Sequence, residues 1–93
     1  MNYQTELTCQ RIDIWLWHAR IYKSRSISHF SIKNEIIKIN SKSVIKPATL
    51  IKKDDIITIP WNNSSRVIQV LGFSTRRVSA KLCHSLYKEI LEK

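Results

Sequence analysis

One stretch of the chain, RIDIWLWHARIYKSRS at residues 11–26, constrains the fold most, because an apolar helix runs directly into a group of cations. Four apolar residues recur in it at helical spacing: Ile12, Trp15, Leu16 and Ala19. This periodicity predicts a helix over residues 11–21. Asp13 lies in its first turn, where the helix dipole favours an acid. A second apolar stripe lies on another face, so we expect cover on two sides: Ile14, Trp17 and Ile21.

A second short helix is expected to follow, antiparallel to the first. Ser24 suits its N-cap, because a serine hydroxyl accepts a hydrogen bond from a backbone N–H two or three residues on. Three residues of this helix are expected to point inward: Ile27, Ser31 and Ile32. Lys33 and the pair at residues 34–35 mark its expected end.

The middle of the chain predicts a β-hairpin. Ile37 and Ile39 flank Lys38, which is expected to point outward. The β-branched run breaks at Asn40 and Ser41 and then resumes, which is typical of two strands joined by a tight turn.

Two further strands and a last helix are expected in the second half. A turn at residues 54–55 precedes the apolar run IITIP, and the alternation over residues 66–73 predicts another strand. Ser79 is expected to cap a final helix. Its broad apolar band is expected to pack on the face of the first helix that carries Trp17. The band consists of Leu82, Cys83, Leu86, Tyr87, Ile90 and Leu91.

The length of the chain, 93 residues, corresponds to a single domain. A hydrophobic content of 43% leaves enough apolar surface for a core. The expected fold class is α+β: two short antiparallel helices packed on a small curled antiparallel sheet, with a C-terminal helix. Residues 1–10 are expected to be a flexible N-terminus, and residues 60–93 an extension of a strand and a helix packed on the same domain.

The charge of the chain points to a polyanionic partner. The formal net charge is +9 with a sequence pI near 10.0, and such a bias concerns partners rather than fold. Between His18 and Lys53 there is one acid, Glu35, against nine cations: Arg20, Lys23, Arg25, Lys33, Lys38, Lys42, Lys46, Lys52 and Lys53. This concentration argues against a general solubility bias, which stays open as the alternative.

Several classes of protein are disfavoured. No apolar run approaches the roughly 18 residues of a membrane span, and residues 1–10 lack the pattern of a signal peptide, so we expect a cytoplasmic protein. Cys9 and Cys83 lie far apart without a CxxC pattern, which predicts two free thiols. Cys83 and His84 are adjacent, so on a helix they point in different directions and do not suggest a metal site.

A set of short motifs resembles a known family. RIDIWLW, KSRS, IKIN and DDIITI, in this order, resemble the S4 RNA-binding domain, also called the αL motif. The tryptophan pair together with VLGFSTRR and LYKE is similar to the 15-kDa heat shock protein family of ribosome-associated proteins. The similarity runs from Arg11 to Glu89 and implies that residues 11–59 form the S4 RNA-binding domain.

The chain departs from that family pattern in three ways. The family has glycines where this chain has Asn34, Ser41 and Asp54, so we expect left-handed backbone there, which Asn and Asp tolerate best among residues with a side chain. Phe30 replaces a residue that is commonly polar. The long basic tail of the heat shock relatives has no counterpart here, so in length the sequence is closer to the short ribosome quality-control relatives of the RqcP type.

The resemblance implies that the family grips RNA at the loop between the two helices, flanked by the hairpin. In this view the tryptophans fix the first helix so that its basic end is rigid, and cations with hydroxyls between them meet phosphates at fixed spacing. The expected RNA-binding residues are Arg11, Arg20, Lys23, Ser24, Arg25, Ser26, Lys33, Lys38, Asn40, Lys42, Arg76 and Arg77.

Several of these residues have a structural alternative. Arg25 contacts RNA or pairs with Asp13, and Arg76 and Arg77 extend the phosphate surface or stay solvated. The two tryptophans of the first helix are expected in the core rather than as stacking platforms. Trp61 is the better stacking candidate, with a role as a lid over the sheet as its alternative.

These observations lead us to expect a non-enzymatic, ribosome-associated RNA-binding protein. The resemblance implies binding to large-subunit rRNA and to 50S subunits that carry peptidyl-tRNA, in rescue, recycling or quality control after stalling or heat stress. A basic DNA-binding regulator and an RNA-targeting accessory of an RNA-modifying enzyme are the alternatives. A membrane-surface role lacks the amphipathic cationic helix that it requires. We expect no metal and no cofactor, and a monomer when the protein is free.

Overall fold

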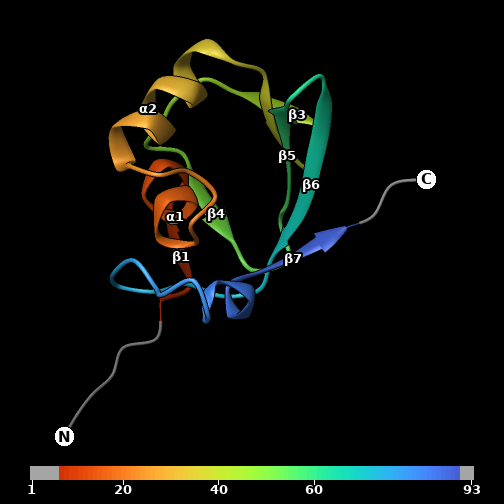
Figure 1. Cartoon of the computed structure of the whole chain (residues 1–93). Coiled ribbons are helices and arrows are strands. Elements are labelled where there is room, and N and C mark those ends of the chain that lie inside the picture. Colours follow the sequence, from red (N-terminus) through yellow and green to blue (C-terminus); the bar gives the residue numbers. More distant parts are fainter. Residues whose placement is uncertain (1–6, 91–93) are drawn as a thin grey trace, which may run out of the picture.

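The fold is α+β, as predicted, and the computed structural model describes residues 7–90. Two helices lie on one side of an antiparallel sheet (Figure 1). The helices are α1 (Ile12–His18) and α2 (Arg25–Asn34), and a 3-10 turn η1 spans Cys83–Ser85. The strands are β1 (Cys9–Arg11), β2 (Ile37–Ile39), β3 (Lys42–Val44), β4 (Leu50–Lys52), β5 (Ile56–Trp61), β6 (Ser64–Val70) and β7 (Tyr87–Ile90).

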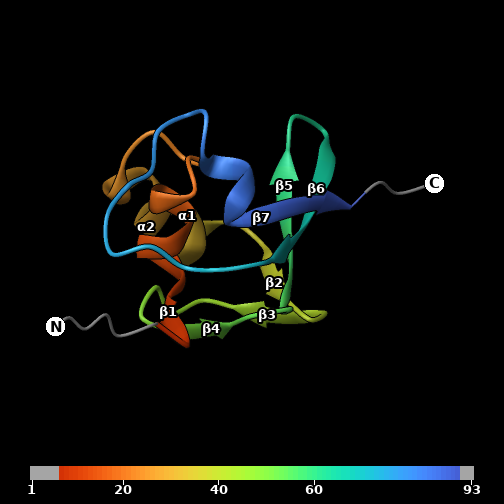
Figure 2. The ribbon, with the colours of Figure 1, turned by 90° about the horizontal axis from the view of Figure 1, so that it is seen from below.

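The strands form two sheets. The larger has the order β3-β2-β5-β6-β7 with antiparallel neighbours, and the smaller pairs β1 with β4. Figure 2 shows the small sheet beneath the helices, at the same level as β3. The predicted hairpin is confirmed, because Ile37 lies opposite Val44 in the β2–β3 pair and Lys38 is exposed.

The apolar stripe of the first helix forms the centre of the core, as predicted. Its four residues, Ile12, Trp15, Leu16 and Ala19, have no exposed surface. They pack in one cluster with side chains of the sheet such as Ile57 and Ile68, which lie opposite each other on β5 and β6 and are also fully buried. The helix itself is shorter than expected and ends at His18.

The inward face of α2 differs from the prediction by one residue. Ser31 and Ile32 are buried as expected, but Ile27 is 45% exposed and Ser28 takes the inward position. Residues 28, 31 and 32 share one helix face at spacings of three and four, and Ile27 lies about 100° away from Ser28. The helix ends at Asn34, where the sequence predicted.

Two of the three positions expected to be left-handed are so. Ser41 and Asp54 both have a φ of 75°, and each lies in a turn between two strands. Asn34 was predicted wrongly, because it is the last helical residue of α2 and its side-chain amide donates to the carbonyl of Phe30 at 2.9 Å.

The small sheet was not predicted. Cys9 and Gln10 belong to β1, so the predicted flexible segment at residues 1–10 extends too far; its first six residues lie outside the described residues. The division of the chain into an S4 domain at residues 11–59 and an extension at residues 60–93 stays a prediction. Strand β5 continues across this boundary. The pairing of Cys9 with Lys52 joins segments more than forty residues apart, which no local pattern indicates.

The predicted C-terminal helix is wrong within the described residues. Residues 71–82 form an extended segment, here called the strap, and residues 87–90 form β7 on the edge of β6. Pairing satisfies the backbone groups that the edge of β6 would leave open. An ion pair between Arg66 and Glu89, at 2.8 Å, adds to it. Leu91 lies outside the described residues.

Candidate nucleic-acid interface

The elbow, residues 19–24, connects the two helices and carries the predicted cationic site. The amide nitrogens of Ala19 and Arg20 donate to the carbonyls of Trp15 and Trp17 at 2.8 and 3.0 Å, which closes the end of α1. Ile21 and Tyr22 are only 5% and 9% exposed and anchor the elbow in the core. Arg20 and Lys23 remain exposed on the surface. The elbow therefore presents cations from a fixed backbone.

Ser24 caps α2, as predicted. Its hydroxyl accepts a hydrogen bond from the amide of Ile27 at 3.1 Å and lies 3.1 Å from the hydroxyl of Ser26. Behind the cap, the buried hydroxyl of Ser28 donates to the carbonyl of Asp13 at 2.9 Å, which ties α2 to α1. The orientation of the first turn of α2 is thus fixed from both ends.

Asp13 is the centre of a cationic cluster. Its side chain is fully buried and accepts two hydrogen bonds from the guanidinium of Arg11, at 3.0 and 2.8 Å. This bond raises the pKa of Arg11. Arg25 approaches the same carboxylate to 3.9 Å with half of its side chain exposed. Of the two alternatives for Arg25, the pairing with Asp13 is present, and the exposed half leaves the guanidinium open to a ligand.

His29 also faces this cluster, and the sequence analysis missed it. Its Nδ1 lies 3.5 Å from the Asp13 carboxylate and its side chain is 48% exposed. A signal existed, because His29 follows Arg25 by one helical turn and therefore lies on the same face of α2. Three basic groups thus surround one carboxylate, which leaves the cluster cationic.

Arg77, one of the expected RNA contacts, is bound to two backbone carbonyls of the protein. Its Nε donates to the carbonyl of Trp17 at 3.1 Å, and an Nη donates to the carbonyl of Tyr22 at 3.2 Å. Its side chain is half-buried. The guanidinium bridges the end of α1 and the elbow and acts as a brace behind them. Arg76, its neighbour, is exposed.

The strap holds α1 through further hydrogen bonds. The indole of Trp15 donates to the carbonyl of Gly72 at 2.8 Å, and the amide of Val78 donates to the carbonyl of His18 at 3.1 Å. Arg20 donates to the carbonyl of Val78 at 3.2 Å. The first helix was expected to be covered on two sides. In the structure α2 and the strap cover it, and within residues 7–90 no C-terminal helix takes part.

His18 joins the strap to the core. Its Nδ1 lies 3.0 Å from the carbonyl oxygen of Ser74, which only accepts, so Nδ1 carries the proton. Burial lowers the pKa of His18, because the charged form loses its hydration; the Ser74 carbonyl opposes this shift.

The hairpin supplies a second group of expected contacts. Lys38 and Lys42 are exposed, whereas Asn40 is committed to the turn. Its amide nitrogen donates to the Asp55 carboxylate at 3.0 Å, and its amide oxygen accepts from the backbone of Ile56 at 2.9 Å. Figures 1 and 2 both place this hairpin on the sheet, away from the elbow. The structure therefore separates two groups of expected residues. The hairpin group consists of Lys38, Asn40 and Lys42, and the elbow group of Arg20, Lys23, Ser24, Arg25 and Ser26.

The remaining expected residues are Lys33 and Trp61. Lys33 is exposed in the last turn of α2. Trp61 packs against the core, with Arg66 at 4.8 Å from its ring centroid and the Tyr22 ring at 6.0 Å. Of the two roles expected for Trp61, packing over the sheet is present, with Arg66 covering one face of the indole.

Comparison with known proteins identifies the family. No protein-family model matches the chain. It is 35% identical over 90 residues to the heat shock protein 15 homolog of Aeromonas salmonicida, covering 96% of this chain and 67% of that relative. The chain belongs to the heat shock protein 15 family. It is also 29% identical over 82 residues to heat shock protein 15 of Escherichia coli K12, covering 88% of this chain and 61% of that relative.

A solved structure supports the same assignment. The fold matches heat shock protein 15 of Vibrio cholerae, described as trimeric, with a TM-score of 0.80 and 28% identity, over 92% of this chain and 83% of that one. The chain thus spans about three fifths to two thirds of the sequence relatives it matches. The family assignment confirms the heat shock part of the resemblance.

Residues 7–90 contain no group of three or more potential metal ligands. None of their helices has the length and apolar character needed to cross a membrane. Cys9 is half-buried and Cys83 is buried, both as free thiols.

Proposed function

We propose that this chain is a non-enzymatic RNA-binding protein that binds large-subunit rRNA through the elbow. The observation that supports this most is the arrangement of cations around a fixed backbone. Lys23 and Arg25 flank the capping hydroxyl of Ser24, and Arg77 braces the elbow from behind through two backbone carbonyls. A surface that is ordered before binding loses less entropy when it meets phosphates.

The first turn of α2 contributes to this surface. Free backbone N–H groups at the start of a helix attract anions, and α2 begins at Arg25 between the exposed residues Lys23 and Ser26. Guanidinium groups bind phosphate oxygens with two parallel hydrogen bonds. Structured RNA, whose backbone presents phosphates in fixed geometry, suits such a site, since base edges in its deep groove are inaccessible.

Membership of the heat shock protein 15 family supports a proposal for the biological setting. We propose a cytoplasmic protein that engages 50S subunits still carrying peptidyl-tRNA after stalling or heat stress, in rescue, recycling or quality control. In that setting Lys38 and Lys42 of the hairpin provide a second set of phosphate contacts. We expect a monomer when the protein is free; a trimer in sedimentation equilibrium, as described for the V. cholerae relative, would contradict this.

Salt dependence tests the electrostatic basis of the proposal. If five to seven phosphates are neutralised, log affinity for a structured rRNA fragment falls with log salt at a slope of roughly −4 to −6. An affinity that stays flat with rising KCl would refute the model. Duplex DNA serves as competitor, because displacement of rRNA by equal amounts of DNA favours a DNA-binding regulator instead.

A double variant tests the location of the site. Replacing Lys23 and Arg25 by alanine is expected to weaken rRNA binding by about 1–3 kcal/mol without unfolding the protein. The matched control replaces Lys81 and Lys88, which are also exposed cations but belong to neither the elbow nor the hairpin. Equal losses in both double variants would move the site away from the elbow.

Sedimentation of a tagged protein tests the ribosomal setting. Under the proposal, the protein in a cell lysate travels with free large subunits, and the fraction bound rises after heat stress. Migration at the top of the gradient at low salt, under both conditions, would contradict a role on the ribosome.

A further inference from the structure

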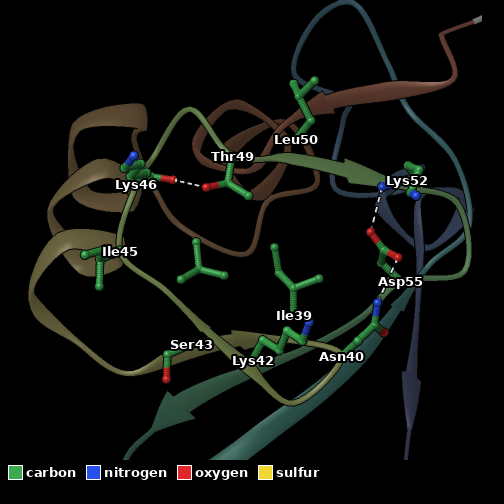
Figure 3. A pocket seen from close by; sticks show the side chains of 11 residues that line it. Ile39, Asn40, Lys42, Ser43, Ile45, Lys46, Thr49, Leu50, Lys52 and Asp55 are labelled. Carbon is green, nitrogen blue, oxygen red and sulfur yellow. Dashed lines mark hydrogen bonds between the residues drawn. The ribbon is translucent and has the colours of Figure 1, made fainter.

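A groove lies between the β2–β3 hairpin and strand β4, apart from the elbow (Figure 3). Its volume is about 530 Å³, within the roughly 300–1,000 Å³ of small-ligand sites. Its lining combines apolar side chains with cations and one acid. None of the structural roles described above explains this combination.

The apolar part of the groove is exposed. Ile45 and Leu50 are 69% and 58% exposed, and Ile39, which lines the groove from the end of β2, is half-buried. Single exposed apolar side chains are common on protein surfaces. Here two of them line one concave site together with polar side chains, a combination that is typical of ligand-binding grooves.

The cationic part comes from three segments. Lys42 belongs to β3, Lys46 to the following loop and Lys52 to β4, and Figure 3 shows them on different sides of the groove. Within residues 7–90 none of the three forms an ion pair. Their ammonium groups are therefore available to an anion that enters the groove.

The one acid of the groove is already engaged. The carboxylate of Asp55 accepts from the Asn40 amide at 3.0 Å and from the backbone amide of Lys52 at 2.8 Å. Both of its oxygens thus hold the turn together. With three lysines against this single carboxylate, the groove attracts anions that also carry an apolar or planar part.

We propose that the groove binds one unpaired nucleotide of an RNA, with the base on Ile39, Ile45 and Leu50 and the adjoining phosphates on the lysines. The inference rests on the proposed function and deepens it, because it names the element of RNA structure that is recognised. Unpaired bases are the part of RNA that proteins read most readily. Lys42 belongs both to the hairpin group of expected contacts and to the groove, so one RNA strand passes from one to the other.

Three RNA hairpins of equal length test the proposal. One carries a single bulged nucleotide, the second carries an abasic residue at the bulge, and the third is fully paired. We expect the protein to bind the bulged RNA about fivefold more tightly than the paired one, which is the change expected when roughly 40 Å² of apolar surface is buried. The abasic RNA should behave like the paired one.

Two variants locate the effect. Leu50→Ser is expected to remove the preference for the bulge and to leave the affinity for the paired hairpin unchanged. The control is Ile36→Ser, at a residue that is 67% exposed and outside the groove, and it should keep the preference. Because both side chains lie at the surface, neither change is expected to unfold the protein.

The outcomes distinguish a failure of the groove site from a failure of the proposed RNA binding at the elbow. Equal affinity for all three RNAs overturns the groove site, and salt-dependent binding of the paired hairpin would still support the elbow. A bulge preference that survives Leu50→Ser overturns it as well. So does a self-association of the free protein that Leu50→Ser abolishes, because a second copy would then occupy the groove.

Discussion

The elbow and the groove are both cationic, but they hold their charges in different ways. At the elbow and directly behind it, guanidinium groups are fixed by acceptors of the protein: Arg20 by the carbonyl of Val78 and Arg77 by two backbone carbonyls. In the groove, Lys42, Lys46 and Lys52 have no ion pair within the described residues. The planar fork of arginine suits fixed geometry, whereas the ammonium of lysine adapts to its ligand.

This difference has an energetic meaning. Ordering a long side chain on binding costs about 0.5–1.5 kcal/mol. The elbow avoids part of that cost because its backbone and its braces are in place before RNA arrives. Under the proposal, the groove bears this cost, and its lysines adapt to different bases. We therefore expect substitutions around the elbow to change stability and affinity together, and substitutions in the groove to change affinity alone.

The largest effect is expected from Trp15→Ala. The side chain is fully buried and its indole holds the strap at Gly72, so its loss should lower the free energy of unfolding by about 3–5 kcal/mol. Leu50→Ala in the groove should change it by less than about 0.5 kcal/mol. Urea denaturation measures both. Similar losses for the two variants would remove the distinction between the regions.

Arg77→Ala tests the brace. We expect rRNA affinity to fall by about 1 kcal/mol, because two carbonyls lose a charged donor and the elbow loosens. The salt slope should stay unchanged, since no phosphate contact is lost. Arg76→Ala is the control, because an exposed cation that meets a phosphate reduces the slope by about 0.7–0.9. A reduced slope in Arg77→Ala would show that Arg77 itself contacts RNA.

Ser24→Ala tests the cap. Loss of the bond from the Ile27 amide should cost about 1 kcal/mol of stability, the usual value for an N-cap serine. Ser26→Ala, which removes only the exposed contact with the Ser24 hydroxyl, should cost a few tenths at most. Thermal unfolding followed by circular dichroism compares the two. If Ser26→Ala proves the more harmful, the hydroxyl contact outweighs the cap.

The smallest effect concerns pH and His18. Burial lowers its pKa in the folded state, so below the ordinary pKa of histidine, about 6.5, the unfolded chain binds more protons than the folded one. Stability is therefore full above that pH and falls as the pH drops toward the folded-state pKa. His18→Gln should flatten this dependence in urea titrations, whereas His84→Gln, at an exposed residue, should keep it. A dependence that persists in His18→Gln would assign it to another group.

Local patterns predicted part of the molecule. The spacing of the apolar residues placed Trp15 in the core, and the break at residues 40–41 placed the hairpin turn. The small sheet and β7 depend on strands that pair across long stretches of sequence, so no window of the chain carries them. Tyr87 and Ile90 fit a helical band as well as a strand. Residues 87–90 form a strand because their backbone pairs with the edge of β6.

The sequence predicts which types of residue gather at the candidate site, but not what each side chain contacts. That arginines and lysines gather near residue 24 is visible in the sequence. That Arg77 binds carbonyls is not, because a backbone acceptor carries no sequence signal. Asn40 likewise looked like an RNA contact, and its amide proves to be occupied on both sides by the turn. Which cations stay available depends on partners that only the folded chain brings together.

The strap has a consequence for biosynthesis. The carbonyls of Gly72, Ser74 and Val78 and the guanidinium of Arg77 hold α1 and the elbow in place, although they follow the elbow by about fifty residues in the chain. While the polypeptide is still being translated, its cations emerge long before the parts that orient them. A nascent chain that ends before Arg76 carries most of the positive charge of the finished protein without its shape. Under the proposed function, selective binding of RNA therefore begins only near the end of synthesis.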